Sequence, residues 1–148
     1  MSLKNRIQDD MKAAMRAQDK DRLAAIRLIM AAVKQREVDE RITLDDVQVI
    51  AVLERMLKQR RESIVQFERA GREDLVAKET LELEIIQAYM PEALSEAEIE
   101  ALIDSAIAAT GAQSMRDMGR AMAYVKERAQ GRADMSLVST RLKSRLVG

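Results

Sequence analysis

Basic side chains grouped around one tyrosine are the residues of this chain best suited to binding a ligand. Arg116, Arg120, Tyr124 and Arg128 follow one another at steps of four residues, which places them along one side of a helix. Guanidinium groups can make paired hydrogen bonds to a phosphate, and a tyrosine ring can stack on a base or a ribose. This ridge favours contact with the phosphate backbone of a nucleic acid.

More basic residues follow toward the C-terminus. The segment 111–148 holds eight basic and three acidic side chains, and the segment 91–110 holds five acidic and no basic ones, although the whole chain has 25 of each sign. We predict that four of these later residues belong to the same phosphate-contacting set, namely Arg132, Arg141, Lys143 and Arg145. The alternative is an ordinary solvated surface, which is the commoner meaning of such a charge pattern.

The direction of these basic side chains decides between the two interpretations. Nucleic-acid binding requires that they converge on one outward surface. If their guanidinium groups instead pair with Glu96, Glu100 or Asp104 of the acidic segment, the RNA-binding hypothesis fails and a plain scaffold is left.

The composition gives little support to catalysis. The chain has no cysteine and no histidine, which excludes disulfides, thiolate nucleophiles, Cys/His zinc sites and histidine proton shuttles. Its serines lie outside any Gly-x-Ser-x-Gly pattern, and its five glycines form no phosphate-binding loop. Neighbouring carboxylates such as Asp45 and Asp46 do not converge as an acid and a base must. We predict no catalytic residue, no metal site and no cofactor.

The elements that position the basic residues are predicted to be helices throughout. Hydrophobic residues make up 47% of the chain, yet only three residues are aromatic, a profile that favours helix over sheet. Apolar residues recur at helical spacing over about 3–17, 20–38, 43–70 and 73–89, with Thr43 as a plausible cap of the third segment. Pro91 then disfavours helical geometry at the residue before it.

Three shorter helices are predicted after Pro91. Ser95 with Glu98, and Ser114 with Asp117, form capping boxes that open two of them, the second running from Met115 to about residue 129. The sequence therefore predicts an all-α fold, with an N-terminal four-helix region over residues 1–90 and a C-terminal three-helix module over residues 91–148.

A tight joint is predicted between the last two helices. Gly131 can adopt the left-handed conformation that ends one helix, and Asp134 can cap the next. Arg132 lies between them and is held at a corner where a backbone phosphate can dock. Together with Pro91, Gly131 and Asp134 are the predicted structural joints of the module.

Two other patterns have a structural interpretation. Arg60 falls on an apolar seam of its helix, so we expect it to pair with Glu79 or Glu82; an anion site with its basic neighbours is the alternative. The methionines are predicted to fill the core more often than to form a partner-binding surface, in particular those that fit helical stripes: Met11, Met15, Met30, Met118 and Met122.

The location of the protein is predicted to be cytoplasmic, without a membrane partner. No stretch approaches 18 uncharged apolar residues, and Asp9 and Asp10 interrupt an N-terminus that is unlike a signal or transit peptide. The balanced overall charge gives no reason to expect DNA as a partner.

The C-terminal part of the chain resembles a known module. Tyr89 to Pro91, the segment DMGRAM at 117–122 and the joint from Gly131 to Asp134 are similar to the tail shared by the B subunit of the tRNA-dependent amidotransferase (GatB) and the small YqeY proteins. Upstream stretches such as MKAAMRAQDKDRLAAIRLIMAAVKQRE resemble the YqeY N-terminal region, so the likeness covers nearly the whole chain.

This resemblance carries implications for function. In the family, the tail is associated with recognising the body of tRNA away from the anticodon, and a similar module is appended to some glutaminyl-tRNA synthetases. It implies that Gly119, Gly131 and Asp134 form the scaffold of the module. The catalytic domain of the amidotransferase subunit has no counterpart here.

Three functions follow as hypotheses. The leading one is a tRNA-binding adaptor, non-catalytic by itself, that presents tRNA to an amidotransferase or an aminoacyl-tRNA synthetase. The first alternative is a helical protein-interaction module whose four-helix region docks a partner or self-associates. The second alternative is a carbon-nitrogen ligase with glutamine as the amido donor, which family labelling suggests but for which the chain offers no recognisable nucleophile and base.

Overall fold

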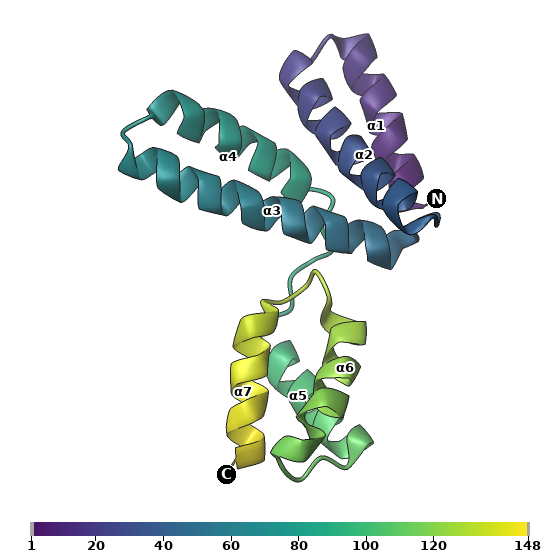
Figure 1. Cartoon of the computed structure of the whole chain (residues 1–148), viewed down its shortest axis with the longest axis vertical. Helices are drawn as coiled ribbons and strands as arrows, with labels where there is room; N and C mark the ends of the chain where they lie inside the picture. Colours follow the sequence, from purple (N-terminus) through teal and green to yellow (C-terminus); the bar gives the residue numbers. More distant parts are fainter. Residues whose placement is uncertain (1, 148) are drawn as a thin grey trace. The chain divides into compact units, whose positions relative to one another are not determined.

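The computed structural model describes residues 2–147, and it is helical (Figure 1). Within that range the chain forms no strand, which confirms the all-α prediction. The helices are α1 (Leu3–Ala17), α2 (Lys20–Glu40), α3 (Asp46–Arg69), α4 (Glu73–Gln87), α5 (Glu96–Thr110), α6 (Met118–Ala129) and α7 (Met135–Val147), with a 3₁₀ turn, η1 (Met115–Asp117), before α6. The chain divides into two compact units, Met1–Met90 and Pro91–Gly148, each described by itself below.

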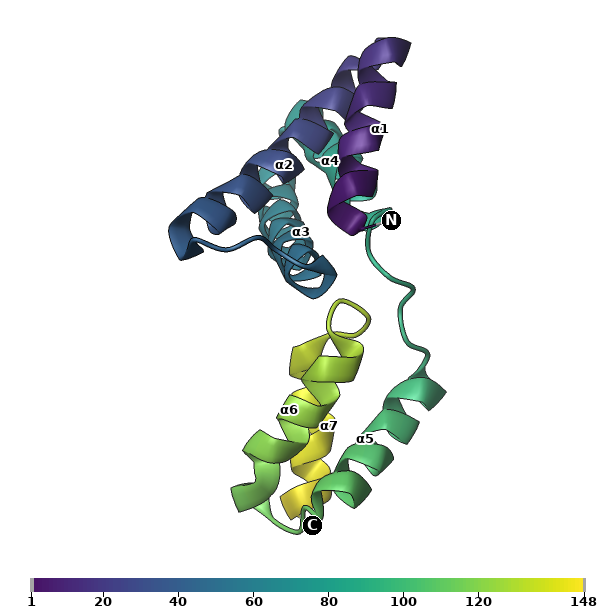
Figure 2. The ribbon, with the colours of Figure 1, turned by 90° about the vertical axis from the view of Figure 1, so that its right-hand side faces the viewer.

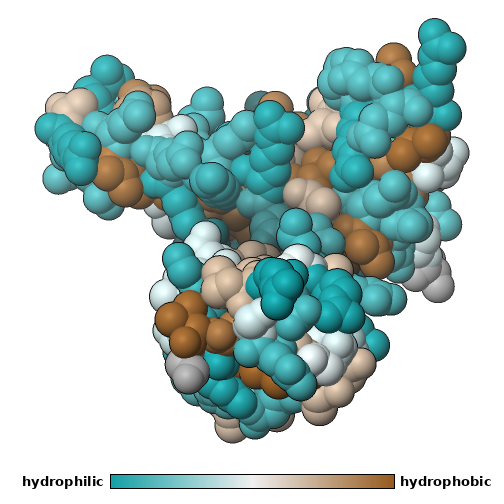
Figure 3. Space-filling model, turned by 60° about the horizontal axis from the view of Figure 1, so that its bottom comes forward, coloured by the Kyte–Doolittle hydropathy of each residue, from teal (hydrophilic) through white to brown (hydrophobic). Residues whose placement is uncertain are grey.

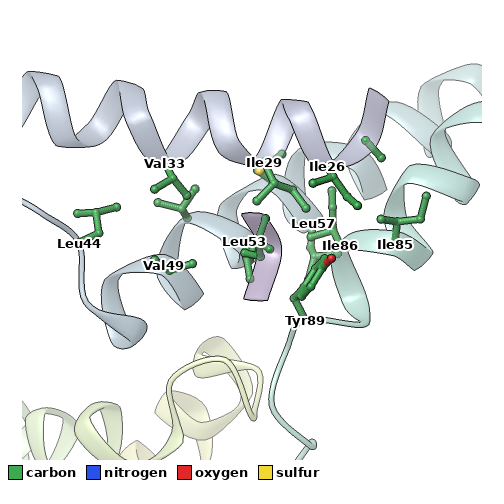
Figure 4. Close-up of a cluster of buried hydrophobic side chains, with 14 of the residues drawn as sticks. Ile26, Ile29, Val33, Leu44, Val49, Leu53, Leu57, Ile85, Ile86 and Tyr89 are labelled. Atoms are coloured by element: carbon green, nitrogen blue, oxygen red, sulfur yellow. The ribbon is translucent and has the colours of Figure 1, made fainter. Parts of the chain in front are cut away.

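The N-terminal unit consists of two helical hairpins. Short loops join α1 to α2 and α3 to α4, and Figure 1 and Figure 2 show each pair lying side by side. The hairpins also contact one another, mainly through α2 and α4. Ile26 and Ile29 of α2, Leu53 of α3 and Ile86 of α4 are almost completely buried where the four helices meet (Figure 4). Each helix therefore contributes one apolar stripe to a shared core.

Polar caps fix where these helices begin. Asp19 caps α2 by accepting a hydrogen bond from the backbone N–H of Arg22. Asp45 caps α3, and Gln48 completes a capping box with it, so the prediction of Thr43 as the cap was wrong. Gln48 explains why the helix begins at Asp45. It lies three residues after Asp45, so its side chain can accept a hydrogen bond from the Asp45 N–H while its own N–H donates to the Asp45 side chain.

The end of α4 lies two residues before the predicted one. The helix ends at Gln87, and a short turn carries the chain through Tyr89 and Met90 to Pro91. In this turn Tyr89 points into the core, where only 4% of its surface is exposed (Figure 4). Leaving the helix early is what allows this ring to be buried.

The expected partners of Arg60 are both present. Its Nε lies 2.9 Å from Oε2 of Glu82 and 3.4 Å from Oε2 of Glu79, so α3 and α4 share an ion triad whose side chains are largely buried. Among the methionines predicted for the core, Met15 is an exception because it is exposed. It lies near the C-terminal end of α1.

The C-terminal unit packs three helices around one core (Figures 1 and 2). Ile103 of α5, Val125 of α6 and Leu142 of α7 are fully buried in it. The capping box of Ser95 and Glu98 opens α5 as predicted. Hydrogen bonds from Ser95 lower the pKa of the Glu98 carboxyl, which keeps this cap ionised.

The start of α6 differs from the prediction. Ser114 and Asp117 form their capping box, but the first three residues after Ser114 form the 3₁₀ turn η1, and α6 begins at Met118 instead of Met115. Arg116 consequently lies on the turn and not on α6 itself. At the other end Gly131 has a φ of 78°, and Asp134 accepts a hydrogen bond from the N–H of Ser136 at 2.9 Å, as the joint requires.

Within residues 2–147, none of the helices is long and apolar enough to cross a membrane.

Candidate nucleic-acid interface

The helix α6 has one buried face and one charged face. Ala121, Val125 and Ala129 are completely buried against α5 and α7. Arg120 and Arg128 lie on the part of the helix that faces solvent and are exposed. The periodicity of the sequence therefore places the predicted basic residues outward, where they can meet a ligand.

Asp117 organises the start of this face. Its Oδ2 accepts hydrogen bonds from the N–H groups of Gln113 at 2.9 Å and Ser114 at 3.3 Å, and its Oδ1 pairs with Arg120 at 2.5 Å. These bonds, first among them the one from Gln113, lower the pKa of Asp117, and the ionised carboxylate holds Arg120 over the turn. Arg116, on η1, is exposed and makes no ion pair within residues 2–147.

Tyr124 and Arg128 form a stacked pair. The guanidinium carbon of Arg128 lies 3.6 Å from the centroid of the Tyr124 ring, and its Nη1 donates a hydrogen bond to the Tyr124 carbonyl at 3.1 Å. Tyr124 is partly buried against the core. Arg128 thus covers the ring face that the sequence assigned to base stacking, and a base reaches that ring only by displacing the guanidinium group.

Arg132 ties the joint between α6 and α7 to the beginning of the unit. Its Nε donates a hydrogen bond to the Glu92 carbonyl at 2.9 Å, and its own carbonyl accepts one from the N–H of Leu94 at 2.7 Å. The side chain is therefore held at the corner, as the sequence predicted. Its two terminal nitrogens make no hydrogen bond within residues 2–147 and can serve a phosphate.

The basic residues of α7 behave differently. Arg141 pairs with Glu96 at 2.5 Å and with Glu100 at 3.2 Å, and Arg145 pairs with Asp104 at 2.6 Å. The hydrogen bond with Glu96 is the main reason why the pKa of Arg141 is raised. These are the ion pairs under which the hypothesis of one convergent basic surface fails, and they are present for these two arginines. Both therefore leave the candidate set, and the hypothesis is kept only for the basic residues outside these pairs.

The other predicted basic residues form no ion pair with the acidic helix α5 in the described part of the chain, although Arg132 lies close enough to Glu98 to help lower its pKa. Lys143 of α7 is exposed and forms no ion pair in the part of the chain that the structure describes. Arg116, Arg120 and Arg128 lie on or beside α6. Arg120 pairs with Asp117 and Arg128 with Glu127 at 3.6 Å, and none of the three forms an ion pair with α5. Figure 3 shows a surface on the C-terminal unit that is mostly hydrophilic, with hydrophobic residues in small separate patches.

Two further residues of α6 lie outside the predicted ridge. Lys126 of α6 is exposed and without an ion pair among residues 2–147; the four-residue spacing of the ridge omitted it, because it lies on another side of the helix. Gly119 lies at the beginning of α6, and a Cβ added there meets no atom within 4 Å. Packing inside the described chain does not account for this glycine.

One protein family matches nearly the whole chain. The Yqey-like protein family covers residues 4–146 and so runs through both units. The chain belongs to the YqeY family. The resemblance to the YqeY proteins is therefore confirmed.

Three relatives of this YqeY protein carry the name "Altered inheritance of mitochondria protein 41, mitochondrial". The protein of Pyrenophora tritici-repentis is 33% identical over 141 residues, which cover 93% of this chain and 77% of the relative. That of Eremothecium gossypii is 42% identical over 85 residues, 57% of this chain and 46% of the relative. The match to the Saccharomyces cerevisiae protein, 35% over 85 residues, also covers 46% of it. The matched region thus spans about half the length of the last two relatives.

The names of these relatives assign them to mitochondria. For this chain, a cytoplasmic location stays a prediction.

Proposed function

We propose that this YqeY protein binds tRNA through basic residues of η1, α6 and the joint before α7, together with Lys143 of α7. The residues that carry the contact are Arg116, Arg120, Arg128, Arg132 and Lys143, with Tyr124 as the support of Arg128. Arg141 and Arg145 are not included, because acidic side chains of α5 already hold them.

One observation carries the proposal: Arg116, Arg120 and Arg128 are exposed, and none of them forms an ion pair with the acidic helix α5. Asp117, Tyr124 and Glu92 hold three of them in place through their local contacts. Ordering the cations in advance lowers the entropy cost of binding a phosphate backbone. The glycine at position 119 adds room for a close approach beside Arg116 and Arg120.

The family supplies the choice of tRNA as the nucleic acid. The similar tail of the amidotransferase B subunit is associated with the body of tRNA, and the same use here makes the protein an adaptor that presents tRNA to an amidotransferase or a synthetase. That partner enzyme is part of the proposal. No catalytic step is assigned to this chain.

Two matched double variants of the full chain test the proposal. Arg116→Ala/Arg120→Ala removes two exposed cations of the candidate face, and Arg141→Ala/Arg145→Ala removes the same charge from α7. Binding of fluorescently labelled bulk tRNA is measured by anisotropy over a series of salt concentrations. We expect the first variant to bind more weakly, with a log-log salt slope smaller by about one for each phosphate that is no longer neutralised. The second variant should keep the wild-type slope.

Equal tRNA affinity for the wild type and the Arg116/Arg120 variant contradicts the proposal. Equal weakening by both variants contradicts the assignment to α6, because it shows that only net charge matters. Arg132→Lys adds a third readout: it keeps the charge but loses the fixed Nε bond to Glu92, so binding that needs a held guanidinium group should still fall.

A further inference from the structure

The N-terminal unit carries a surface of its own between α1 and α2. A hollow of about 200 Å³ lies there, with Ile7, Met30 and Val33 among its lining residues and Lys4, Lys34 and Glu37 around it. A second hollow of about 320 Å³ continues from Lys34 and Glu37 over the C-terminal end of α2 to Arg41 and Ile42. Because they share two residues, the two hollows form one continuous surface, here called the α2-end surface.

The charge of this surface is positive. Its lining includes three cations, Lys4, Lys34 and Arg41, and one carboxylate, Glu37. Oε2 of Glu37 is already bound, by Lys4 Nζ at 2.5 Å and by the N–H of Leu44 at 2.9 Å. These contacts, led by the one from Lys4, lower the pKa of Glu37 and keep it ionised and engaged. Lys34 and Arg41 are exposed and form no ion pair within residues 2–147.

The same surface also exposes apolar side chains. Val38 is 59% exposed and Ile42 39% exposed, on either side of Arg41. Arg41 itself has a φ of 56°, a conformation that costs energy for a residue with a Cβ, and this turn directs Ile42 and Thr43 along the second hollow. Apolar and cationic groups thus alternate on one surface, and the apolar side chains are exposed to water.

The neighbouring groove between α2 and α3 provides a contrast. It is larger, about 460 Å³, but Arg36 and Arg55 are balanced there by Asp39 and Glu40. Arg36 is also bound, by Glu40 and by the carbonyl of Gln48. The α2-end surface therefore has an excess of unpaired cations beside apolar residues that this neighbouring groove lacks.

We propose that the α2-end surface docks a partner protein through a short acidic segment with aliphatic side chains. Carboxylates of the segment pair with Lys34 and Arg41, and its aliphatic side chains fill the hollow over Met30 and Val33 and contact Val38 and Ile42. A phosphate backbone uses the cations but leaves the apolar half of the surface uncovered, which is why a peptide fits better. This inference concerns the N-terminal unit and does not depend on tRNA binding.

Three labelled ten-residue peptides test the chemistry with the full chain. One alternates Leu and Glu, the second replaces every Glu by Lys, and the third replaces every Leu by Ser. We expect the Leu/Glu peptide to bind in fluorescence anisotropy, and the other two to bind at least about tenfold more weakly, since each loses one of the two kinds of contact. No binding of the Leu/Glu peptide, or equal binding of the Ser peptide, overturns the proposal.

Matched variants test the location. Lys34→Ala/Arg41→Ala should weaken binding of the Leu/Glu peptide at least about fivefold, as should Val38→Ser, whereas Arg55→Ala/Lys58→Ala, which removes two exposed cations of α3, should leave it unchanged. All four substituted positions of the two double variants, and Val38, are exposed, so the variants should fold. Equal effects of both double variants overturn the location.

Two other occupants would overturn the proposal and are detected directly. If a labelled RNA oligonucleotide binds and the Lys34/Arg41 variant abolishes that binding, the surface serves a nucleic acid. If sedimentation shows a dimer of the wild type that Val38→Ser dissociates, the occupant is a second copy of the chain. Failure of the peptide experiment leaves the tRNA result of the Arg116/Arg120 variant untouched, and the reverse also holds.

Discussion

The hydroxyl group of Tyr89 donates a hydrogen bond to Oδ2 of Asp10 at 2.6 Å, which joins the turn after α4 to the first helix of the chain. The guanidinium carbon of Arg6 lies 5.0 Å from the centroid of the same ring. Residues from the two ends of the N-terminal unit therefore meet at one buried aromatic side chain. This contact closes the arrangement of the two hairpins.

Replacing Tyr89 by Phe should destabilise the N-terminal unit. The variant keeps the buried ring but leaves the Asp10 carboxylate without its donor, and losing a hydrogen bond to a charged group costs about 1.5–3 kcal/mol. Urea unfolding followed by circular dichroism measures the change. Tyr124→Phe is the matched control, because the Tyr124 hydroxyl makes no hydrogen bond within residues 2–147; an equal loss in both variants contradicts the role of Asp10.

The stability of the unit should also fall at alkaline pH. Burial first, and the bond to Asp10 next, raise the pKa of Tyr89 above its ordinary value near 10. A group whose pKa is raised by folding contributes its full stability below the unfolded pKa and loses it as pH rises toward the folded one. The midpoint of urea unfolding should therefore decrease above about pH 10 in the wild type. Tyr89→Phe should show a smaller decrease; identical profiles contradict this origin.

The ion triad of Arg60 makes a second stability prediction. Its side chain and those of Glu79 and Glu82 are 18%, 18% and 12% exposed, so they are largely desolvated. Arg60→Ala leaves the two carboxylates without their cation. Breaking a buried pair costs roughly 3–5 kcal/mol, and we expect the free energy of unfolding to fall by an amount at the lower end of this range.

The triple variant Arg60→Met/Glu79→Leu/Glu82→Leu is the control for this triad. It removes the charges together and should recover most of the stability that Arg60→Ala removes, because apolar residues of similar volume need no compensating charge. Urea unfolding of both variants measures the difference. A triple variant as unstable as Arg60→Ala shows that packing, and not the unpaired carboxylates, causes the loss.

Helix positions could be predicted from the sequence because their signals are local. Ser95 with Glu98 fixes the start of α5, and Gly111, with a φ of 66°, fixes its end; both depend only on residues within one turn. The start of α3 could have been predicted in the same way, since Asp45 with Gln48 is an equally local signal that the choice of Thr43 overlooked. The 3₁₀ turn at Met115 is harder to foresee, because a capping box is compatible with either kind of helix.

The pairing of Arg141 and Arg145 could not be decided from spacing alone. Both α5 and α7 carry charges at steps of four residues, and complementary ladders of this kind fit together only if the two helices pack with those faces adjacent. Segment 111–148 has an excess of basic residues, but two of them form ion pairs with acidic residues of segment 91–110. Sequence indicated the two excesses; the packing of α7 beside α5 determines which cations remain.

Replacing Gly119 by Ala should stabilise the C-terminal unit. The added Cβ meets no atom within 4 Å, the glycine has no positive φ, and α6 gains a residue with better helix propensity. The free energy of unfolding should increase by up to about 1 kcal/mol, which urea unfolding measures. If a tRNA backbone approaches this position, the same variant should bind tRNA more weakly than the wild type while being more stable. A variant with unchanged tRNA affinity shows that no backbone approaches there.

The same substitution at Gly131 should have the opposite effect on stability. Gly131 has a φ of 78°, in the left-handed region where a Cβ clashes with the following carbonyl, and the cost for alanine is about 1–2 kcal/mol. Gly131→Asn should cost less, because the short polar side chain tolerates this conformation. Strain at this position also displaces Arg132, whose Nε bond to Glu92 fixes the joint, so tRNA affinity should fall together with stability. A Gly131→Ala protein that is as stable as the wild type contradicts the left-handed joint, and one that is destabilised but binds tRNA normally shows that Arg132 is not part of the interface.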